Sequence, residues 1–313
     1  MKNSKNIKIN FMISKKIVVI GSCNTDMVVK SNRLPVPGET VLGGAFMMNP
    51  GGKGANQAVT IARLSGSATL ISKMGNDLFG KQSIEMYNEE NINTDYIFSD
   101  PHLPSGVALI MVDINGENCI TVASGANGIL SPHDIDKAKS IIESADILLM
   151  QLEIPMKTVE YAAKMAFNKG VKVVLNPAPA AFLSNELLNC LYAIIPNENE
   201  AEMLSGVKVF DWDSARKAAD LINAKGVKIV VITLGSKGAL IKEGNVYHEV
   251  PVVKIKAVDT TAAGDTFCGA FCVGISEGLS TLDAVKLANK ASGITVTREG
   301  AQASIPFRKE IYN

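Results

Sequence analysis

Hydrophobic and polar positions alternate between two patterns along most of the chain. Short apolar runs rich in β-branched residues are followed by longer segments in which apolar residues recur with a helical period. This alternation predicts an α/β fold with a mostly parallel central sheet and helices on both of its faces. The predicted buried strands are Lys16–Ile20, Thr69–Ser72, Ile147–Met150, Val171–Leu175, Ala193–Pro196 and Lys228–Leu234.

Capping residues predict where several helices begin and end. Ser131 is followed by a proline, which indicates an N-cap and the first helical residue. Thr281 is predicted to cap a helix over Leu282–Ser292. Gly170 and Gly226 stand where helix C-caps are expected.

Two stretches, residues 24–48 and 106–124, lack the helical period. In the second, Asn115-Gly116 separates two β-rich runs, which predicts a hairpin. We expect both stretches to supply strands of a second, small sheet that projects from the main domain as a lid or a dimer surface. In residues 107–112 the alternating positions on both faces of the expected strand are apolar, and a lone two-layer lid could not cover them fully, so we expect a homodimer joined there.

The composition is that of a soluble globular chain. Of 313 residues, 47% are apolar and 20% are charged. The 31 basic and 31 acidic residues balance, so no net field favours binding to nucleic acid or to an anionic membrane. The apolar runs are far shorter than the roughly 20 residues that span a bilayer. We expect one domain over residues 15–313 and a disordered tail over residues 1–14.

The cysteines and the missing motifs narrow the chemistry. Five cysteines, an odd number scattered through apolar context, predict free thiols and a cytoplasmic protein. Cys268 and Cys272 have no histidine nearby and are interpreted as core thiols rather than metal ligands. The P-loop motif is absent, and residues 52–57 lack the last glycine of the dinucleotide-binding fingerprint. The missing motifs therefore argue against a P-loop ATPase and against a standard dinucleotide-binding dehydrogenase.

Residues 259–267 carry the strongest chemical signal. Small residues lead into an apolar helical stretch, and the free N–H groups at a helix start attract an anion such as phosphate. A carboxylate at Asp265 competes with such an anion, unless it accepts a proton from a hydroxyl that attacks the bound phosphate. The residues alone leave open the alternative that Asp265 is an N-cap and that the small residues only serve tight helix packing.

Two further clusters offer polar groups. Residues 49–57 hold three glycines with Lys53 and Asn56 as donors, which indicates either a turn at a ligand or a tight connector. Asn24 and Asp26 follow the first strand and share one face of an extended segment, which suits adjacent hydroxyl groups; the alternative is an Asx-turn. These residues lie where ligands collect in open α/β sheets, at the carboxyl ends of the strands.

Polar groups also follow four later strands. They occur in Gln151–Glu153, Asn176–Pro179, Asn197–Glu200 and Thr233–Gly238. Because carboxyl ends of parallel strands meet at one edge of a sheet, these groups are expected to form a polar rim together with the anion cradle. The convergence predicts an active site at that edge.

Two motifs resemble the signatures of the ribokinase-like sugar kinases, the phosphofructokinase-B family. Residues 51–58 (GGKGANQA) are similar to the first signature and residues 257–267 (AVDTTAAGDTF) to the second, within a resemblance that covers residues 16–312. It implies a core sheet of about nine strands and a β lid that pairs with another subunit's lid. The implied activity is ATP-dependent phosphorylation of D-ribose at the 5-hydroxyl. Another small sugar such as deoxyribose, fructose or a sugar acid, a nucleoside, and a non-catalytic sugar sensor are the alternatives.

The resemblance also implies roles for individual residues on the sugar side. Asp265 would be the base. The backbone of Ala262, Ala263, Gly264 and Asp265 would form the anion hole. The sugar would be held by Asn24, Asp26, Gly52, Lys53, Asn56 and Glu153.

On the nucleotide side, ATP would be bound by Asn197, Thr233, Leu234, Gly235, Ser236, Lys237, Gly238, Gly264 and Asn289. Glu200 would complete an Asn-x-x-Glu motif that organises Mg²⁺ and phosphate. A monovalent cation, usually K⁺, would be held by Asp259, Thr261, Thr295, Arg298, Gly300 and Ser304. Asn289 stands where family members often have a histidine, and Ala303 replaces a common proline, which leaves nucleotide preference and cation affinity less defined.

Overall fold

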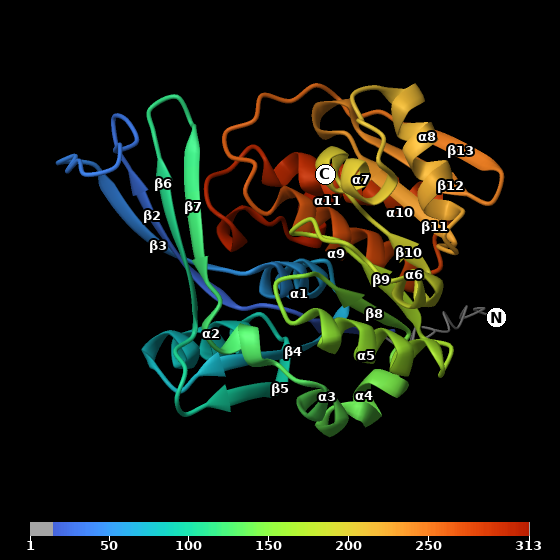
Figure 1. Ribbon diagram of the computed structural model, residues 1–313, viewed down its shortest axis with the longest axis horizontal. Helices are drawn as coiled ribbons and strands as arrows, with labels where there is room; N and C mark the ends of the chain where they lie inside the picture. Colours follow the sequence, from blue (N-terminus) through green and yellow to red (C-terminus); the bar gives the residue numbers. More distant parts are fainter. Residues whose placement is uncertain (1–14, 313) are drawn as a thin grey trace, which may run out of the picture.

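The computed structural model describes residues 15–312; residues 1–14 and 313, and with them the predicted N-terminal tail, lie outside the described residues. A nine-stranded sheet in the order β13-β12-β11-β10-β9-β8-β1-β4-β5 forms the centre, with helices on both faces (Figure 1). All pairs from β11 to β5 are parallel, while β12 and β13 form an antiparallel edge. The predicted α/β architecture is confirmed.

The elements have the following bounds. The strands of the central sheet are β1 Lys16–Ile20, β4 Ser67–Gly75, β5 Asn93–Asp100, β8 Ile147–Met150, β9 Lys172–Leu175, β10 Ala193–Ile194, β11 Ile229–Thr233, β12 Ala239–Glu243 and β13 Val246–Val250. The main helices are α1 Lys53–Arg63, α2 Leu78–Glu89, α3 Pro132–Lys137, α4 Lys139–Glu143, α5 Met156–Phe167, α6 Asn185–Cys190, α7 Glu198–Ser205, α8 Trp212–Asn223, α9 Ala263–Ser276, α10 Thr281–Thr295 and α11 Arg308–Ile311. Short 3₁₀ turns are η1 Gly125–Ile129, η2 Gly235–Lys237 and η3 Gln302–Ser304.

The predicted strands agree with the structure to within a few residues. β1 and β8 have the predicted bounds, β4 is longer at both ends, and β10 is shorter. The apolar run of β1 is continuous because it is buried on both faces: Val19 belongs to the core cluster on one side of the sheet and Val18 to the cluster on the other. β5 and the β12–β13 hairpin, at the two edges of the sheet, had not been predicted.

The predicted helix ends are right in three cases and wrong in one. Ser131 caps α3 in a capping box, and Gly170 and Gly226 have the positive φ of C-terminal glycines. Thr281 is not an N-cap, because the Ser280 side chain accepts from the Asp283 N–H and Thr281 is the first helical residue. Two neighbouring hydroxyl residues offer the same capping signal, and the pattern does not separate them.

A separate four-stranded sheet, here called the lid, stands beside the main body (Figure 1). Its order is β3-β2-β6-β7, with bounds Ala45–Gly51, Asn24–Lys30, Gly106–Val112 and Asn118–Ala123. The strands come from the two stretches that lack helical period, and Gly116 lies at the predicted turn with positive φ. The predicted small sheet is confirmed.

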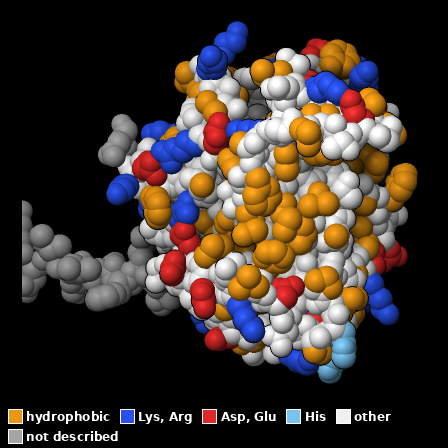
Figure 2. Space-filling model, turned by 90° about the vertical axis from the view of Figure 1, so that its left-hand side faces the viewer, with side chains coloured by type: hydrophobic (Ala, Val, Ile, Leu, Met, Phe, Trp, Pro, Cys, Tyr) orange, Lys and Arg blue, Asp and Glu red, His pale blue; other side chains and the backbone are white. Residues whose placement is uncertain are grey.

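The outer face of the lid carries an apolar patch. Strand register places Val29, Phe46, Met48, Leu109 and Met111 on this face, and each is exposed; Phe46 is 64% and Leu109 55% exposed. Figure 2 views the molecule from the lid side and shows hydrophobic side chains gathered at its centre. We call these five residues the outer lid patch.

Helix α9 positions the candidate site. Twelve of its residues are buried, and it packs against α10 and α1. Small side chains along it permit this close packing: a Cβ on Gly269 would lie 2.7 Å from the Thr60 side chain. The N-terminus of α9 thereby reaches the edge of the sheet where the parallel strands end. No helix among residues 15–312 is long and apolar enough to cross a bilayer.

Candidate active site

A cleft of about 400 Å³ lies between the inner face of the lid and the carboxyl ends of the parallel strands. Many of the predicted site residues line it: Asn24, Asp26, Gly52, Lys53, Asn56, Glu153, Asn197, Glu200, Thr233, Thr261, Ala262, Gly264 and Asp265. The lid contributes Ala108, Ile110, Asn118, Ile120 and Val122. The structure therefore brings together side chains that are up to 241 residues apart in the chain, from Asn24 to Asp265.

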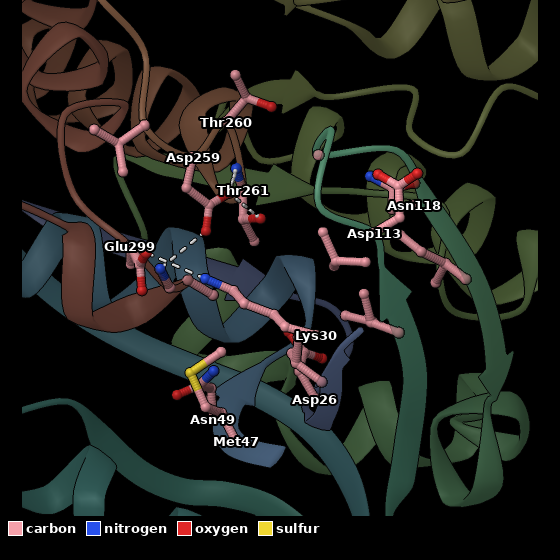
Figure 3. A pocket seen from close by; sticks show the side chains of 18 of the residues that line it. Asp26, Lys30, Met47, Asn49, Asp113, Asn118, Asp259, Thr260, Thr261 and Glu299 are labelled. Atoms are coloured by element: carbon pink, nitrogen blue, oxygen red, sulfur yellow. Dashed lines mark hydrogen bonds and ion pairs between the residues drawn. The ribbon is translucent and has the colours of Figure 1, made fainter. Parts of the chain in front are cut away.

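A larger cavity of about 780 Å³ adjoins this cleft further out beneath the lid. Asp26, Thr260 and Thr261 line both spaces, so the two are continuous. Figure 3 shows the cavity bounded by lid side chains on one side and by residues 257–261 and 299–303 on the other. Lys30 of β2 reaches across it to Glu299, with Nζ and Oε1 3.1 Å apart.

The start of α9 has the properties of an anion cradle. Its N-cap, Ala262, has the left-handed conformation with φ 60°, and no side chain caps the helix. The Ala263 N–H bonds to Thr260 O at 3.2 Å, while the Gly264 and Asp265 N–H groups find no acceptor among residues 15–312. A Cβ on Gly264 would meet nothing within 4 Å. Strain at a non-glycine residue, free donors and open space together favour an anion-binding role.

The Asp265 carboxylate lies at the floor of the cleft. It is the third residue of α9, so the alternative of an N-cap is wrong. Oδ2 accepts from Asn56 Nδ2 and Oδ1 from Gln57 Nε2, each at 3.0 Å. Burial raises the pKa of Asp265, which the charge of Lys53 and the two amide donors partly offset.

Helix α1 begins one residue after Gly52 and carries Lys53 and Asn56 in its first turn. Gly52 has φ 89°, and a Cβ there would lie 2.7 Å from the Asn24 N atom, so only glycine fits. Burial lowers the pKa of Lys53, but the nearby carboxylates of Asp265, Glu153 and Glu200 raise it more, so the ammonium group stays charged. Asn56 Oδ1 is buried and has no partner within residues 15–312, which leaves it free for a ligand hydroxyl.

Asn24 and Asp26 lie on the inner face of lid strand β2 and both line the cleft, so the Asx-turn alternative is wrong. The Asn24 Oδ1 accepts from Asn127 Nδ2 at 2.9 Å, which turns the Asn24 amide nitrogen away from that contact. The Asp26 carboxylate is 8% exposed and accepts no hydrogen bond from residues 15–312. Burial, together with the charges of Glu153 and Asp265, raises its pKa to about 6, against the opposing effect of Lys53.

Glu153 links the connection between β1 and β2 to the start of α1. Its Oε2 accepts from Ser22 Oγ at 2.5 Å and from the Lys53 N–H at 3.2 Å. These contacts hold the carboxylate beside the connection between β1 and β2, where Asn24 follows. Among the residues that line the cleft, Lys53 carries the single ammonium group, and four residues carry carboxylates: Asp26, Glu153, Glu200 and Asp265.

The predicted nucleotide-binding residues divide into two groups. Asn197 and Glu200 form a reciprocal capping box at the start of α7, and burial raises the pKa of Glu200. Thr233, at the end of β11, and Gly264, on α9, also line the cleft. The others lie beyond it, as turn η2 and its flanks or on α10: Leu234, Gly235, Ser236, Lys237, Gly238 and Asn289.

Three of the residues beyond the cleft have structural contacts of their own. Leu234 is buried in the core, Lys237 Nζ donates to the Phe210 carbonyl, and Asn289 Nδ2 donates to Val250 O at 3.1 Å. A Cβ on Gly238 would lie 2.1 Å from the same Val250 carbonyl. Turn η2 and α10 therefore meet at the end of β13, next to the cleft.

Comparison with known proteins assigns the family. The model of the pfkB family carbohydrate kinases matches residues 14–308. The chain belongs to the pfkB family of carbohydrate kinases. It is 44% identical to the ribokinase of Haemophilus influenzae over 296 residues, which cover 95% of this chain and 97% of that relative. It is 38% identical to the deoxyribokinase of Salmonella typhi over 93% of this chain and 95% of that protein.

A solved structure of Arabidopsis thaliana ribokinase, complexed with ribose and ATP, superposes with a TM-score of 0.88. It is 33% identical to this chain, and the superposition covers 96% of this chain and 98% of the plant protein. The ribokinase-like fold expected from the two sequence motifs is thus confirmed, as is membership of a family of ATP-dependent sugar kinases.

The loops predicted to hold a cation in this pfkB family kinase lie side by side. Asp259 Oδ1 accepts from the Thr261 N–H and hydroxyl at 2.8 and 2.6 Å, and its Oδ2 accepts from the Gly300 N–H at 3.0 Å. Arg298 pairs with Glu310, and the hydroxyls of Thr295 and Ser304 bond within the protein. Residues 15–312 hold no cluster of three or more His, Cys, Asp or Glu side chains suited to a metal. Any cation here would therefore rely on backbone oxygens.

Sequence analysis gave no individual role to Gln57 or Asn127, which both shape the site of this kinase. Gln57 donates to Asp265, and Asn127 bonds both the Cys23 backbone and Asn24. Asn176, which the sequence placed in the polar rim, lines the cleft. Gln57 directly follows Asn56, so a buried amide next to a predicted ligand was the available signal. Asn127 had no comparable signal, because its contacts come from residues more than 100 positions earlier.

Proposed function

We propose that this chain transfers the γ-phosphoryl group of ATP to the 5-hydroxyl of D-ribose, with Asp265 as the base. The observation that carries this proposal is the position of the Asp265 carboxylate, beside the open N–H groups of Gly264 and Asp265 and inside the cleft. The similarity to the H. influenzae protein named ribokinase, and to the plant structure complexed with ribose and ATP, supports this choice of substrates.

The reaction is an in-line displacement at phosphorus. The sugar 5-oxygen forms a bond to the γ-phosphorus, the bond from that phosphorus to the β,γ-bridging oxygen breaks, and ADP leaves. The hydroxyl proton passes to Asp265, and the N–H groups of Gly264 and Asp265 stabilise the charge on the moving phosphoryl group. The charged Lys53 also lies in the cleft and favours the approach of the triphosphate.

The sugar is held between the lid and α1. Carboxylates accept hydrogen bonds from sugar hydroxyls, and amide groups both donate and accept them. Asp26 and Glu153 offer the carboxylates, while Asn24 and Asn56 offer amides and Lys53 an ammonium group. This grip is polar throughout, which suits a free pentose better than the flat apolar base of a nucleoside. Gly52 has no side chain, which leaves room where the start of α1 approaches Asn24.

The nucleotide occupies the region in and beside the cleft that is formed by Asn197, Thr233, turn η2 and Asn289. Mg²⁺ would arrive on the ATP phosphates and keep several waters, as this ion prefers. Both Glu200 oxygens accept hydrogen bonds from Asn197, so Glu200 would act on the ion through water rather than by direct contact. The ion would neutralise charge on the β- and γ-phosphates.

A monovalent cation such as K⁺ would sit between the loops of residues 259–261 and 298–304. The donors fit this chemistry, because the carbonyl oxygens of Thr261, Arg298 and Gly300 accept no hydrogen bond from residues 15–312. Asp259 ties the two loops together through Gly300. Thr261 directly precedes the N-cap of α9, so a bound cation would supply positive charge near the anion cradle.

The protein works as a homodimer in which the outer lid patches of two copies cover one another. Five exposed apolar side chains on one sheet face are the feature that supports this arrangement. The lid excludes water from the cleft, which keeps ATP from being hydrolysed. Five free cysteines and the use of ATP support a cytoplasmic location.

Asp265→Asn tests the catalytic assignment. We expect kcat to fall by about 10²–10⁴-fold, the usual contribution of a positioned base, while KM for ribose stays within a few-fold. Coupled ADP release measures both constants. Glu117→Gln, on the lid turn and outside both cavities, is the matched control and should keep normal kcat. A nearly normal kcat in Asp265→Asn removes Asp265 from the role of base.

Deoxyribose is the second candidate substrate, because a deoxyribokinase is 38% identical over nearly the whole chain. Measuring kcat/KM for ribose, 2-deoxyribose, fructose and a nucleoside with ATP distinguishes the candidates. We expect ribose to give the highest value. A site that hydrogen-bonds the 2-hydroxyl should discriminate strongly against a sugar that lacks it. A higher value for 2-deoxyribose would assign the chain to the second substrate.

A further inference from the structure

A chain of buried amide side chains lies behind Asp265, and of its members only Asn176 also lines the cleft. Gln57 Nε2 donates to Asp265 Oδ1 at 3.0 Å and to Asn176 Oδ1 at 3.3 Å. Gln57 Oε1 accepts in turn from Gln151 Nε2. Gln57 and Gln151 are both fully buried, and Asn176 is 7% exposed.

Three separate elements supply this chain. Gln57 is the fifth residue of α1, Gln151 follows β8, and Asn176 follows β9. Buried amides are costly unless they are hydrogen-bonded, so a core junction built only for stability would use apolar side chains. The meeting of these amides behind a single carboxylate indicates that they act on that carboxylate.

The neighbouring bonds fix the directions of the Asn176 and Gln57 amides, whereas Gln151 Oε1 is buried and has no partner within residues 15–312. Asn176 Nδ2 donates to Ile195 O at 3.0 Å, so Asn176 Oδ1 faces Gln57 and accepts from it. Gln151 donates to the oxygen of Gln57. Gln57 is left with one orientation, in which its nitrogen points toward Asp265. Gly21 makes room for Gln151 on the other side, since a Cβ there would lie 1.9 Å from Gln151 Oε1.

We propose that Gln57 is a positioning residue which, held by Gln151 and Asn176, fixes the rotation of the Asp265 carboxylate and keeps it ionised. The inference rests on the proposed role of Asp265 as the base. Gln57 occupies Oδ1 from the buried side. Oδ2 is the oxygen shared with Asn56, whose side chain lines the cleft, so Oδ2 is the atom that receives the proton.

The surroundings of Asp265 determine how strongly its titration depends on Gln57. The ionisable groups around it are Lys53 on α1, Glu153 after β8, Asp26 on the lid, Glu200 on α7 and Cys268 one turn along α9. Lys53 alone among these carries positive charge. Burial already raises the pKa of Asp265, so the loss of a donor to its ionised form should raise that pKa further.

Gln57→Met and the double variant Gln57→Met/Gln151→Met test the inference. The single change leaves Gln151 Nε2 without its acceptor, which lowers stability; the double change replaces both amides by apolar groups of similar size and should recover the melting temperature. We expect kcat to fall about 10- to 100-fold in both variants, the usual effect of losing a hydrogen bond to a charged group. The acidic limb of the kcat profile should move to higher pH in both, and KM for ribose should stay within about threefold.

The outcomes separate this inference from the proposed function. Recovery of kcat together with melting temperature in the double variant means that Gln57 only stabilises the fold, and so does an unmoved acidic limb; either result overturns the inference. If Asp265→Asn is inactive while the double variant has normal kcat, Asp265 remains the base and only the role of Gln57 is refuted. If Asp265→Asn is itself active, the proposed function fails first.

Discussion

Asp26→Asn should make the empty protein more stable at neutral pH while it weakens sugar binding. The Asp26 carboxylate accepts no hydrogen bond from residues 15–312, so the isosteric amide loses none of these contacts. Its pKa is raised from 3.8 to about 6, chiefly by burial and then by Glu153 and Asp265, against Lys53. The folded protein therefore binds this proton more tightly than the unfolded chain does.

The sign and size of the effect follow from that difference. A group with a raised folded-state pKa contributes stability below its unfolded value, near 3.8, and loses it as pH rises through about 6. The difference of about 2 pKa units corresponds to about 3 kcal/mol at about 1.4 kcal/mol per unit. Above pH 6 the ionised carboxylate thus lowers the free energy of unfolding of the empty enzyme by an amount on the order of 3 kcal/mol.

Urea denaturation at pH 7.5 and near pH 4 measures this contribution. Asp26→Asn should exceed the wild type in unfolding free energy at pH 7.5, and the gain should shrink as pH falls toward 4. Glu117→Gln, which changes an exposed lid carboxylate, is the control and should change little at either pH. Ribose should stabilise the wild type more than the variant, because hydroxyl donors favour the ionised form. A variant that is less stable at pH 7.5, or whose gain is the same at both pH values, refutes this reasoning.

Three other predictions follow from the site and the lid. Gly264→Val should fold normally, since a Cβ there meets nothing within 4 Å, yet lose at least about 100-fold in kcat because its side chain enters the anion cradle; normal turnover would contradict the cradle. Leu109→Asp on the outer lid patch should yield a monomer by light scattering where the wild type is a dimer, and a monomeric wild type would count against the patch as an interface. Replacing K⁺ by a bulky organic cation should lower wild-type kcat, and no change would argue against the cation loops.

The central strands were predictable because their burial is uniform. β1 and β8 are covered on both faces, so an unbroken apolar run identifies them. β5 and β13 were missed for the opposite reason: they lie at the two edges of the sheet, and β5, with the sequence NTDYIFSD, has only partly buried or exposed positions. β12, the neighbour of β13, is buried except for Glu243, so its omission has a different cause. Edge strands mix polar and apolar positions, which leaves no clear period for the sequence to display.

The site was predictable to the extent that its chemistry follows strand ends. Polar residues after parallel strands meet by topology alone, which explains why Glu153 and Asn197 line the same cleft. The contacts of Gln57 and Asn127 depend instead on side-chain directions at junctions of distant segments. A sequence pattern gives the order of such residues along one element, but it does not give the partner that packs against them from another.

Strand β2 is seven residues long and has two different tasks on its two sides. Asn24 and Asp26 point into the cleft, while Met27 and Val29 alternate with them toward the outer side. Deleting or inserting one residue in the connection between β1 and β2 would reverse the direction of every side chain of β2, turning Asp26 outward and Met27 inward. Substrate recognition and subunit contact therefore constrain the spacing of the same short segment, and length variation there should be tolerated far less than in the loop over residues 31–44 that follows it.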